Sequence, residues 1–496
     1  MSSAFDPREP PHPGPPALPP LLCEITRAGR RGLLFPKPSE SVPLPASLLR
    51  SDDDTLDLPE VSELDTVRHF TRLSQLNMSV DTTFYPLGSC TMKYNPKANE
   101  AAAAHPGFAD AHPLSVAGGS GGPLEVMYRL QGLLAEISGF DAISLQPAAG
   151  AQGELAGILI MRAYHQSRRD DKRVKVLVPD SAHGTNPATV HMAGYEAVQI
   201  PSDETGQVDM AALATACGDD TAGLMLTNPN TLGLFERRID QIVETVHRAG
   251  GLVYGDGANL NAILGVLRPG DVGIDIMHFN LHKTFSTPHG GGGPGSGPVG
   301  VRTSLAGFLP GPIVERESST GLCRLVMPSR SIGRMKAFHG NFGMMIRAYA
   351  YIRSLGAKGL RRVAENAVLN ANYLRQLLGD VVPARYDHKC MHEFVCPGNR
   401  FHGSSTMDVA KRLLDYGFHA PTVYFPLIVR DALMIEPTET ENRETLEAFS
   451  TALHRIADES TESTDVLHDA PVSLPVGRLD EVEAVKRLKL TWYDRT

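Results

Sequence analysis

Lys283 lies in the stretch NLHKTFSTPHGGGG (280–293), where a lysine between polar neighbours precedes a run of glycines. Such a lysine can clamp a phosphate, form a Schiff base with an aldehyde, or be a solvated surface charge. A P-loop places its glycines before the lysine, and no glycine directly precedes Lys283. The segment GSGPVG (295–300) has the spacing of a dinucleotide fingerprint, but that fingerprint opens a helix, and Pro298 followed by VGVR predicts a strand. Neither phosphate motif is therefore expected.

The Schiff-base interpretation gains support from a carboxylate at a comparable position. Asp256 ends the apolar run GLVYGD (251–256), and Lys283 follows the run IDIMHFN (274–280). Because the carboxyl ends of parallel strands meet at one edge of a sheet, both side chains are expected to face one cleft. Pyridoxal phosphate needs this pair, since its aldehyde condenses with an amine and a carboxylate keeps its ring nitrogen protonated.

Two further segments fit this cofactor. QPAAGAQGE (146–154) is a turn of small residues that opens a predicted helix, so the backbone amides of Gly150, Ala151 and Gln152 could hold a phosphate. His183, in DSAHGTNPAT, follows a predicted strand and could lie flat against the pyridine ring. Together these residues predict a pyridoxal-phosphate site.

The elements that must position these residues alternate between strands and helices. The predicted strands are 175–179, 223–228, 251–256 and 274–280, and the predicted helices between them are 154–166 and 236–250. This alternation predicts an α/β fold with a mainly parallel central sheet covered by helices on both faces. A smaller C-terminal α+β domain is expected from the helices 359–379, 406–417 and 444–456 and the strands 392–396 and 432–436.

We expect four regions along the 496 residues. Residues 1–21 are a proline-rich tail that we expect to be disordered, and 22–120 form an N-terminal arm with active-site loops and a short helix at 61–76. Residues 121–332 form the large cofactor-binding domain, and 333–496 form the smaller C-terminal domain and its tail.

Composition restricts the class of protein. The net charge is −9, and no block of basic residues alternates with aromatic ones, so neither nucleic acid nor an anionic membrane is an expected partner. Six cysteines without a CxxC pair favour a reducing compartment, for which the cytoplasm is the default. The first twenty residues lack the apolar run of a signal peptide, and no apolar stretch is long enough to span a membrane.

Three other features offer weaker alternatives. In DHKCMHEFVC (387–396), the residues His388, Cys390, His392 and Cys396 could in principle bind zinc, but a buried strand with ordinary thiols is favoured and no metal is expected. Cys90 has no identifiable partner base, which favours a packed residue over a nucleophile. Arg430 precedes a predicted strand of the small domain and is a hypothetical binder of a substrate carboxylate.

Long strings in the sequence resemble the P protein of the glycine cleavage system, and in particular the half of it that keeps the cofactor lysine. These strings are YPLGSCTMKYNP (85–96), PAAGAQGE (147–154), DSAHGTNPA (180–188), TNPNTLGLFE (227–236), YGDGANLNAI (254–263), HFNLHKTFSTPHGGGGPG (278–295), SIGRMKAFHGN (331–341), CMHEFV (390–395) and IEPTETE (435–441). The resemblance extends from about residue 25 to about residue 490.

The resemblance implies a fold-type-I pyridoxal-phosphate enzyme, a glycine dehydrogenase (aminomethyl-transferring), that decarboxylates glycine. The remaining aminomethyl group would pass to the lipoyl arm of the H protein, and a similar subunit 1 would complete a heterodimer or heterotetramer. By this resemblance Lys283 forms the Schiff base, His183 stacks on the ring and Asp256 pairs with the ring nitrogen. Asn228 and His282 are further expected cofactor contacts.

Two alternatives remain at this point. The chain could be a self-sufficient pyridoxal-phosphate lyase or decarboxylase that acts on another amino acid. It could also be a binding subunit that keeps the fold without catalysis, although the joint presence of Lys283, Asp256 and His183 argues against this.

Overall fold

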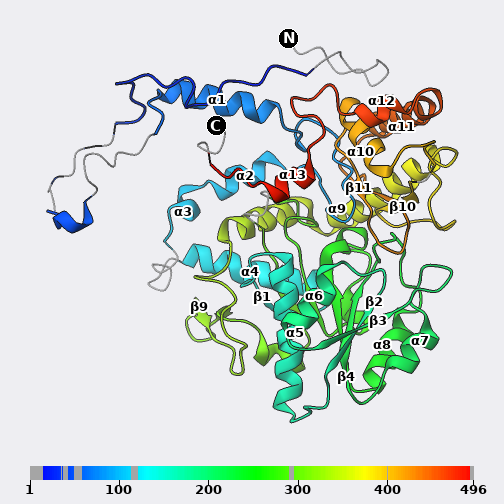
Figure 1. Cartoon of the computed structure of the whole chain (residues 1–496). Coiled ribbons are helices and arrows are strands. Elements are labelled where there is room, and N and C mark those ends of the chain that lie inside the picture. The colour runs from blue at the N-terminus through cyan, green and yellow to red at the C-terminus, as the bar shows by residue number, and fades with distance from the viewer. Residues whose placement is uncertain are drawn as a thin grey trace.

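A seven-stranded sheet forms the centre of the molecule (Figure 1). The structure is a computed structural model and describes residues 15–34, 36, 39, 43–49, 58–112, 121–289, 295–398 and 400–491. The strand order is β1-β7-β6-β5-β4-β2-β3. Strands β3, β2, β4, β5 and β6 run parallel, whereas β7 is antiparallel to both β6 and β1. The strands are β1 (Ala142–Ser144), β2 (Lys175–Pro179), β3 (Glu196–Ile200), β4 (Thr221–Thr227), β5 (Leu252–Asp256), β6 (Ile276–His278) and β7 (Val299–Val301).

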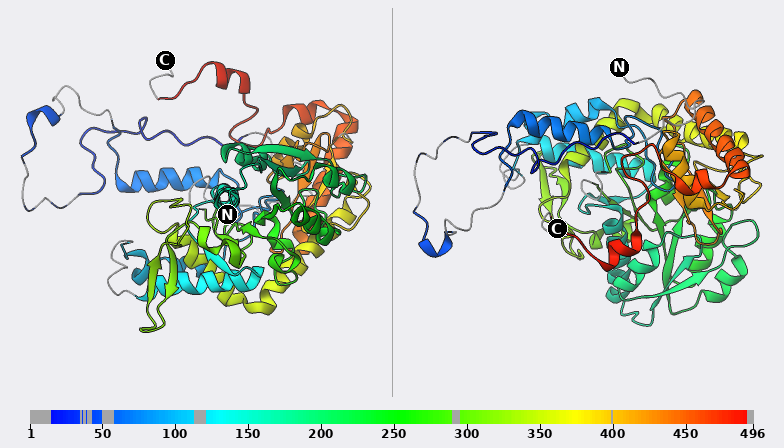
Figure 2. Two further views of the ribbon diagram at one scale, coloured as in Figure 1. Left: turned by 90° about the horizontal axis from the view of Figure 1, so that it is seen from below. Right: turned by 45° about the horizontal axis from the view of Figure 1, so that its top comes forward.

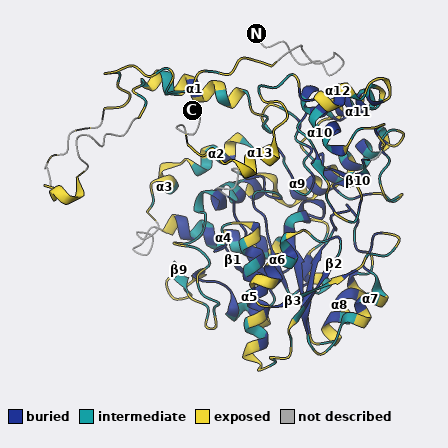
Figure 3. Ribbon diagram, in the orientation of Figure 1, coloured by how far each residue is buried: buried dark blue, intermediate teal, exposed yellow. Residues whose placement is uncertain are grey.

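Helices cover both faces of this sheet, and the strand sequences show why. Consecutive strand residues point to opposite faces, and both faces are apolar: Leu177 packs in one core, whereas Val176 and Val178 pack in another. Helix α5 (Gly150–Ser167) contributes to the core of the second face, and α4 (Gly121–Ser138), α8 (Ile239–Arg248) and α9 (Phe342–Leu377) contribute to the core of the first. Figure 3 shows the strands buried between these helices.

A second, antiparallel sheet has the order β10-β12-β11 and lies beside the first. Its strands are β10 (Phe394–Pro397), β11 (Thr422–Val423) and β12 (Ala432–Ile435), and a hairpin of β8 (Ile313–Arg316) and β9 (Cys323–Val326) forms a third sheet. Helices α10 and α11 pack on the second sheet in a core that includes Leu413, Phe449 and Leu453.

The α-helices are α1 (Glu63–Gln75), α2 (Lys97–Ala103), α3 (Pro106–Ala109), α4 (Gly121–Ser138), α5 (Gly150–Ser167), α6 (Thr185–Met192), α7 (Met210–Ala216), α8 (Ile239–Arg248), α9 (Phe342–Leu377), α10 (Thr406–Asp415), α11 (Arg443–Glu462), α12 (Asp465–Asp469) and α13 (Glu481–Lys486). Short 3₁₀ helices lie at η1 (Ala46–Leu48), η3 (Gly257–Ala262), η4 (Pro269–Val272) and η6 (Thr303–Phe308). None of the helices in the described part of the chain is both long and apolar enough to span a bilayer.

The α/β fold and its two sheets confirm the expectation from sequence, and every strand predicted there is present. Strands β1, β3 and β11, the hairpin β8–β9 and helices α2, α3, α4, α6, α7, α12 and α13 had not been predicted. The strand that had been expected after Pro298 is β7, so GSGPVG does not open a helix. The glycine run 290–293 and residues 1–14 lie outside the described residues.

The predicted helix 359–379 is the second half of a longer element. Helix α9 is interrupted at Gly356, where φ is 60° and ψ is −178°. Residues such as Met345 of its first part belong to the core of the large sheet, and Leu374 of its last part belongs to the core of the small sheet. Because α9 serves both cores, the proposed domain boundary between 332 and 333 stays a prediction.

Lys93 connects the N-terminal arm to both halves of the molecule. Its ammonium group lies 2.7 Å from Glu439 Oε1 and donates to Asn261 Oδ1 at 2.8 Å and to the Thr284 carbonyl at 2.9 Å. The side chains of Lys93 and Glu439 are 1% and 8% exposed. Burial favours the neutral amine, but Glu439 and Tyr351 outweigh this effect and raise the pKa of Lys93. The charged lysine therefore fixes the residue that follows Lys283.

We predict that Lys93→Met destabilises the protein strongly, because it leaves the Glu439 carboxylate buried without its cation. Breaking such a pair costs about 3–5 kcal/mol. The matched control is Lys97→Met, because Lys97 pairs with Asp81 on the surface, where the loss is about 0.5 kcal/mol. Urea denaturation of both variants checks this, and equal shifts of the midpoint would contradict it.

Candidate active site

A cavity of about 250 Å³ lies at the carboxyl ends of the central strands. It is lined by the ends of β4, β5 and β6, by the loop after β2 and by the first turn of α5. Its lining residues are Ser89, Ala149, Gly150, Ala151, Glu154, His183, Thr185, Thr227, Thr231, Asp256, Ala258, His278, Asn280, His282 and Lys283. A ligand is expected at this edge of a parallel α/β sheet.

Lys283 follows β6 and is only partly exposed in the cavity. Its Nζ atom donates a hydrogen bond to the Ser89 carbonyl at 2.8 Å. The loop that carries this carbonyl is held from behind, because the Ser89 amide donates to Glu393 Oε2 at 2.7 Å and the Thr91 amide donates to Glu436 Oε2 at 2.9 Å. The amine of Lys283 therefore has a fixed position.

Asp256 ends β5 and is 7% exposed. Its carboxylate accepts hydrogen bonds from the Ala258 amide at 2.9 Å and from Asn186 Nδ2 at 3.2 Å. Burial acts to raise the pKa of Asp256, but His278, the Ala258 amide, Lys283 and Asn186 outweigh burial and lower it. The site therefore contains a buried anion.

His183 lies in the turn between β2 and α6 and is exposed toward the open cavity. Its Nδ1 atom is 2.9 Å from the Thr185 hydroxyl, and its ring meets the ring of Phe425 edge-on at 5.5 Å between centroids. Desolvation, with a contribution from Lys283, lowers the pKa of His183. The imidazole is therefore neutral at pH 7 and presents an aromatic face.

The first turn of α5 offers backbone amides to the cavity. Its N-cap residue, Ala149, provides no side-chain cap, and the first amides of a helix have no partner within the helix. A glycine is required at the first position, because a Cβ atom on Gly150 would lie 2.0 Å from Asn280 Oδ1. The amides of Gly150 and Ala151 can therefore bind an anion at the positive end of the helix dipole.

Six of the predicted site residues line this one cavity: Lys283, His183, Asp256, Gly150, Ala151 and His282. Burial, with smaller contributions from His289 and Lys283, lowers the pKa of His282 to about 3, so this side chain is neutral.

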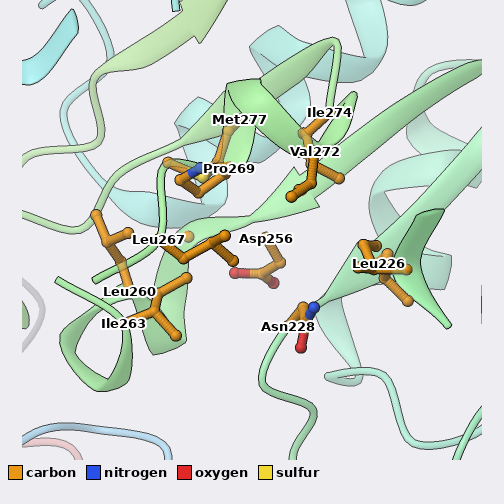
Figure 4. A pocket seen from close by; sticks show the side chains of 13 residues that line it. Leu226, Asn228, Asp256, Leu260, Ile263, Leu267, Pro269, Val272, Ile274 and Met277 are labelled. Atoms are coloured by element: carbon orange, nitrogen blue, oxygen red, sulfur yellow. The ribbon is translucent and has the colours of Figure 1, made fainter. Parts of the chain in front are cut away.

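Gln152 and Asn228 do not line the cavity. The Gln152 side chain is engaged elsewhere, by the Ala148 amide and the Met335 carbonyl. Asn228 Oδ1 accepts from the Glu236 amide at 2.9 Å, and Figure 4 shows Asn228 beside a neighbouring, mainly apolar pocket. Contacts of these two residues with a cofactor stay predictions. Arg430 is 93% exposed and is not among the lining residues, so the structure gives its hypothetical role no support.

The residues of the cavity fit pyridoxal phosphate. An amine, a buried carboxylate, a neutral aromatic ring and free helix amides are the groups that its aldehyde, ring nitrogen, ring face and phosphate require. All four groups converge on one cavity, although they come from β5, the loops after β2 and β6, and the start of α5.

The sequence interpretation missed several lining residues, among them Glu154, Thr185, Thr227 and Asn280. Glu154 is 2% exposed, yet a glutamate near the start of a helix is common for reasons of the helix dipole alone. The one sequence feature that could have pointed to Glu154 is its position directly after the glycines of the predicted phosphate-binding turn. Threonine and asparagine have no motif of their own here.

A buried acidic cluster lies behind the loop that contacts Lys283. His392 Nε2 is 3.8 Å from Glu393 Oε1 and 3.8 Å from Glu436 Oε1, and all three side chains are fully buried. His392 thus groups with two carboxylates rather than with the thiols of Cys390 and Cys396 that the zinc alternative required. Burial raises the pKa of Cys90, as do Glu436 and Glu393, although Lys283 opposes them, which argues against a thiolate nucleophile.

Family models match two parts of the chain. Residues 153–293 match the class-V aminotransferase family, and residues 363–472 match the C-terminal domain of glycine dehydrogenase. The first match contains His183, Asp256 and Lys283.

Similar proteins cover nearly the whole chain. A probable glycine dehydrogenase (decarboxylating) subunit 2 from Caldanaerobacter subterraneus is 54% identical over 95% of this chain and 98% of its own length. Another, from Desulforamulus reducens, is 55% identical over 95% of this chain and 99% of its own length.

Among solved structures, an inhibitor-bound glycine decarboxylase (P-protein) of the glycine cleavage system superposes with a TM-score of 0.71. It is 24% identical and covers 83% of this chain and 93% of its own. A glutamate decarboxylase from Lactobacillus brevis has a TM-score of 0.63 at 14% identity, over 86% of this chain and 96% of its own. At these identities the two structures support the fold alone.

The acidic cluster behind Ser89 leads to a prediction about stability and pH. Burial raises the pKa of Glu436 from 4.5 to about 7. Because the folded state binds this proton more tightly than the unfolded state does, stability should fall as the pH rises from about 4.5 toward about 7. We predict that Glu436→Gln reduces this fall and makes the protein more stable than wild type at pH 8.

Urea denaturation at pH 5 and pH 8 tests this prediction. Glu444→Gln, at an exposed position in the first turn of α11, is the control and should leave the pH dependence as it is in wild type. An equal destabilisation of Glu436→Gln at both pH values would contradict the assignment.

Proposed function

The chain belongs to the glycine dehydrogenase (decarboxylating) subunit 2 family, and from this membership we propose that it decarboxylates glycine and passes the aminomethyl group on to the lipoyl arm of the H protein. The class-V aminotransferase fold implies pyridoxal phosphate as the cofactor. The observation that carries the proposal is the convergence of Lys283, Asp256, His183 and the start of α5 on one cavity.

The chain offers one partner for each part of the cofactor. Lys283 would hold the aldehyde carbon as a covalent Schiff base, and the Asp256 carboxylate would keep the ring nitrogen protonated. His183 would lie against the ring, and the Gly150 and Ala151 amides would bind the phosphate. Bound pyridoxal phosphate supplies a sink for the electron pair that remains when the substrate carboxylate leaves.

Residues of the chain also act on the free lysine. Lys283 Nζ donates a hydrogen bond to the Ser89 carbonyl at 2.8 Å, so this carbonyl would hold the amine whenever it is not bonded to the cofactor. Because the carbonyl oxygen accepts this hydrogen bond, the free amine would stay at the wall of the cavity and out of the space that the substrate needs. The loop position depends on Gly88, because a Cβ atom there would lie 2.2 Å from Met434 Cγ.

The overall reaction balances without a nicotinamide. The bond between the α-carbon and the carboxylate of glycine breaks and releases carbon dioxide. The α-carbon, which keeps its amino group, bonds to one sulfur of the oxidised lipoyl disulfide, and the second sulfur leaves as a thiolate that takes a proton. The disulfide is the oxidant, so the absence of a dinucleotide motif from the sequence is consistent with this activity.

The proposed partner, subunit 1, requires a surface to which it can bind. Two exposed apolar faces, one on α1 and one around α13, are candidates for this surface. Helix α1 exposes Leu64, Val67 and Phe70 at 54%, 56% and 57%, at a spacing of three residues that places them on one face. The segment around α13 exposes Leu479, Val482, Val485 and Leu488 at the same spacing. Figure 2 shows the segment with α13 projecting from the body. We propose that subunit 1 covers these faces in a heterodimer or heterotetramer.

A cytoplasmic location also remains our proposal. It is supported by the six cysteines, which all occur as free thiols.

The visible absorbance of the purified chain with pyridoxal phosphate tests the function. We expect a Schiff-base absorbance band in the wild type and its absence in Lys283→Ala, because only an amine at this position can reach the aldehyde. Once subunit 1 is added, glycine should change the wild-type band. Lys336→Ala serves as the lysine control and should keep the band.

A band that survives in Lys283→Ala would place the cofactor on another lysine. No band in any mixture would favour the binding-only subunit instead. A band that responds to glycine without subunit 1 or the H protein would favour the self-sufficient lyase.

The triple variant Leu64→Ser, Val67→Ser and Phe70→Ser tests the surface. Each large apolar side chain that is buried in an interface is worth about 1.5–3 kcal/mol, so affinity for subunit 1 should fall at least about tenfold. Leu369→Ser, equally exposed at 65% on α9, is the control. Calorimetric titration with subunit 1 measures both, and an unchanged affinity of the triple variant would rule out α1 as the contact.

A further inference from the structure

A buried carboxylate is linked to His183 through one hydroxyl group. The Thr185 hydroxyl lies 3.1 Å from Glu154 Oε2 and 2.9 Å from His183 Nδ1. Glu154 comes from the second turn of α5, Thr185 begins α6 and His183 precedes it, so two elements are connected across the edge of the cavity. Glu154 is 2% exposed, and its other oxygen, Oε1, is buried without a hydrogen-bond partner among the described residues.

The single hydroxyl hydrogen makes this arrangement directional. A hydroxyl donates one hydrogen bond, and an ionised carboxylate can only accept. When Glu154 is ionised, the Thr185 hydroxyl therefore donates to it, and the contact with His183 is a hydrogen bond only if Nδ1 carries the proton. The Thr185 amide, 3.3 Å from Nδ1, is a competing donor that favours the other tautomer. The charge of Glu154 thus decides which of the two tautomers His183 adopts.

We propose that Glu154 is a positioning residue that acts through the Thr185 hydroxyl to hold the proton of His183 on Nδ1, leaving Nε2 as a hydrogen-bond acceptor. The imidazole is thereby fixed in tautomer and in orientation by its other nitrogen, as histidines in reactive sites commonly are. This inference rests on the proposed function for its catalytic consequence. Its structural content concerns this chain alone.

The same contacts make the tautomer depend on pH. Burial, and next the charge of Asp256, raise the pKa of Glu154 to about 7. Above this pH the carboxylate draws the hydroxyl hydrogen, and Nδ1 of His183 keeps its proton. Below it, protonated Glu154 can donate to Thr185, whose hydroxyl then donates to Nδ1, so the proton moves to Nε2.

Other charged and polar groups also face these two residues. Asp256 and Tyr254 of β5 face Glu154, as do Asn186 and Thr189 of α6. Asp256, Lys283 and His278 face His183. Asp256 raises and Lys283 lowers the pKa of His183, and desolvation lowers it further. Burial thus favours the neutral imidazole, and the change that Glu154 brings about in it is one of tautomer.

Nitrogen-15 NMR of the histidine rings reads the tautomer without any catalysis. The full chain contains 18 histidines, so the signals of His183 are assigned by their loss in His183→Gln. In the wild type we expect the proton on Nδ1 at pH 8 and a shift toward Nε2 at pH 6. Thr185→Val, which removes the hydroxyl and keeps the shape, should have the proton on Nε2 at both pH values.

Three further variants separate the relay from general damage. Glu154→Gln should abolish the pH dependence of the tautomer, and Thr185→Ser, which keeps the hydroxyl, should restore most of the wild-type behaviour lost in Thr185→Val. Glu236→Gln is the matched control. Like Glu154, Glu236 is buried, at 1% exposed, and its Oε1 has no hydrogen-bond partner among the described residues, but Glu236 does not line the cavity.

Glycine decarboxylation with subunit 1 and H protein gives the second readout. Thr185→Val should lower kcat about 10- to 100-fold with a smaller change in KM, the range found when the partner that orients a metal-bound histidine is removed. The same tautomer in the wild type and in Thr185→Val at pH 8 would overturn the inference. If the wild type instead shows the expected tautomers but does not decarboxylate glycine, the proposed function fails and the relay stands.

Discussion

A buried carboxylate at the end of the central strand β5 is the constraint on which the rest of the site depends. Asp256 lies where a parallel sheet gathers the ends of its strands, and an anion there is tolerated only if donors and positive charge compensate for the lost water. The Ala258 amide, Asn186 and Lys283 provide that compensation. Of these residues, Ala258 and Lys283 also line the cavity, so part of what stabilises the carboxylate also encloses the candidate cofactor site.

A second set of buried polar and charged groups fixes the opposite wall of the cavity. The arm loop around Ser89 is held by Glu393 and Glu436 from the small sheet, and Lys93 ties the same arm to Glu439 and to the backbone after Lys283. Lys283 is therefore oriented from two sides, by the end of β6 and by the arm.

Much of the fold could be predicted from sequence, because the strands of the parallel sheet are short apolar runs separated by helices of clear periodicity. Strand β2 and the helix α10 had nearly the predicted bounds. Strands β1 and β3 were missed, since three to five residues give little periodic signal, and the polar residues of EAVQI in β3 resemble a loop. Helix α9 was predicted in part, because Gly356 interrupts its pattern.

The residues of the candidate site also fall into those that could be predicted from sequence and those that could not. Lys283, Asp256 and His183 could be found because each follows an apolar strand at the same sheet edge. Glu154 and Thr185 could not, since their role comes from a contact between α5 and α6 that only the packed structure brings together. Asn228 follows a strand as well, yet its side chain turns to the Glu236 amide, which strand-end position alone does not predict.

The most direct test of the account is to locate the covalent bond. The chain is incubated with pyridoxal phosphate, reduced with borohydride to fix the Schiff base, digested and examined by mass spectrometry. The account predicts that the pyridoxyl group is found on the peptide that contains Lys283. A modification on the peptide that contains Lys93, or one spread over surface lysines such as Lys97, would contradict it.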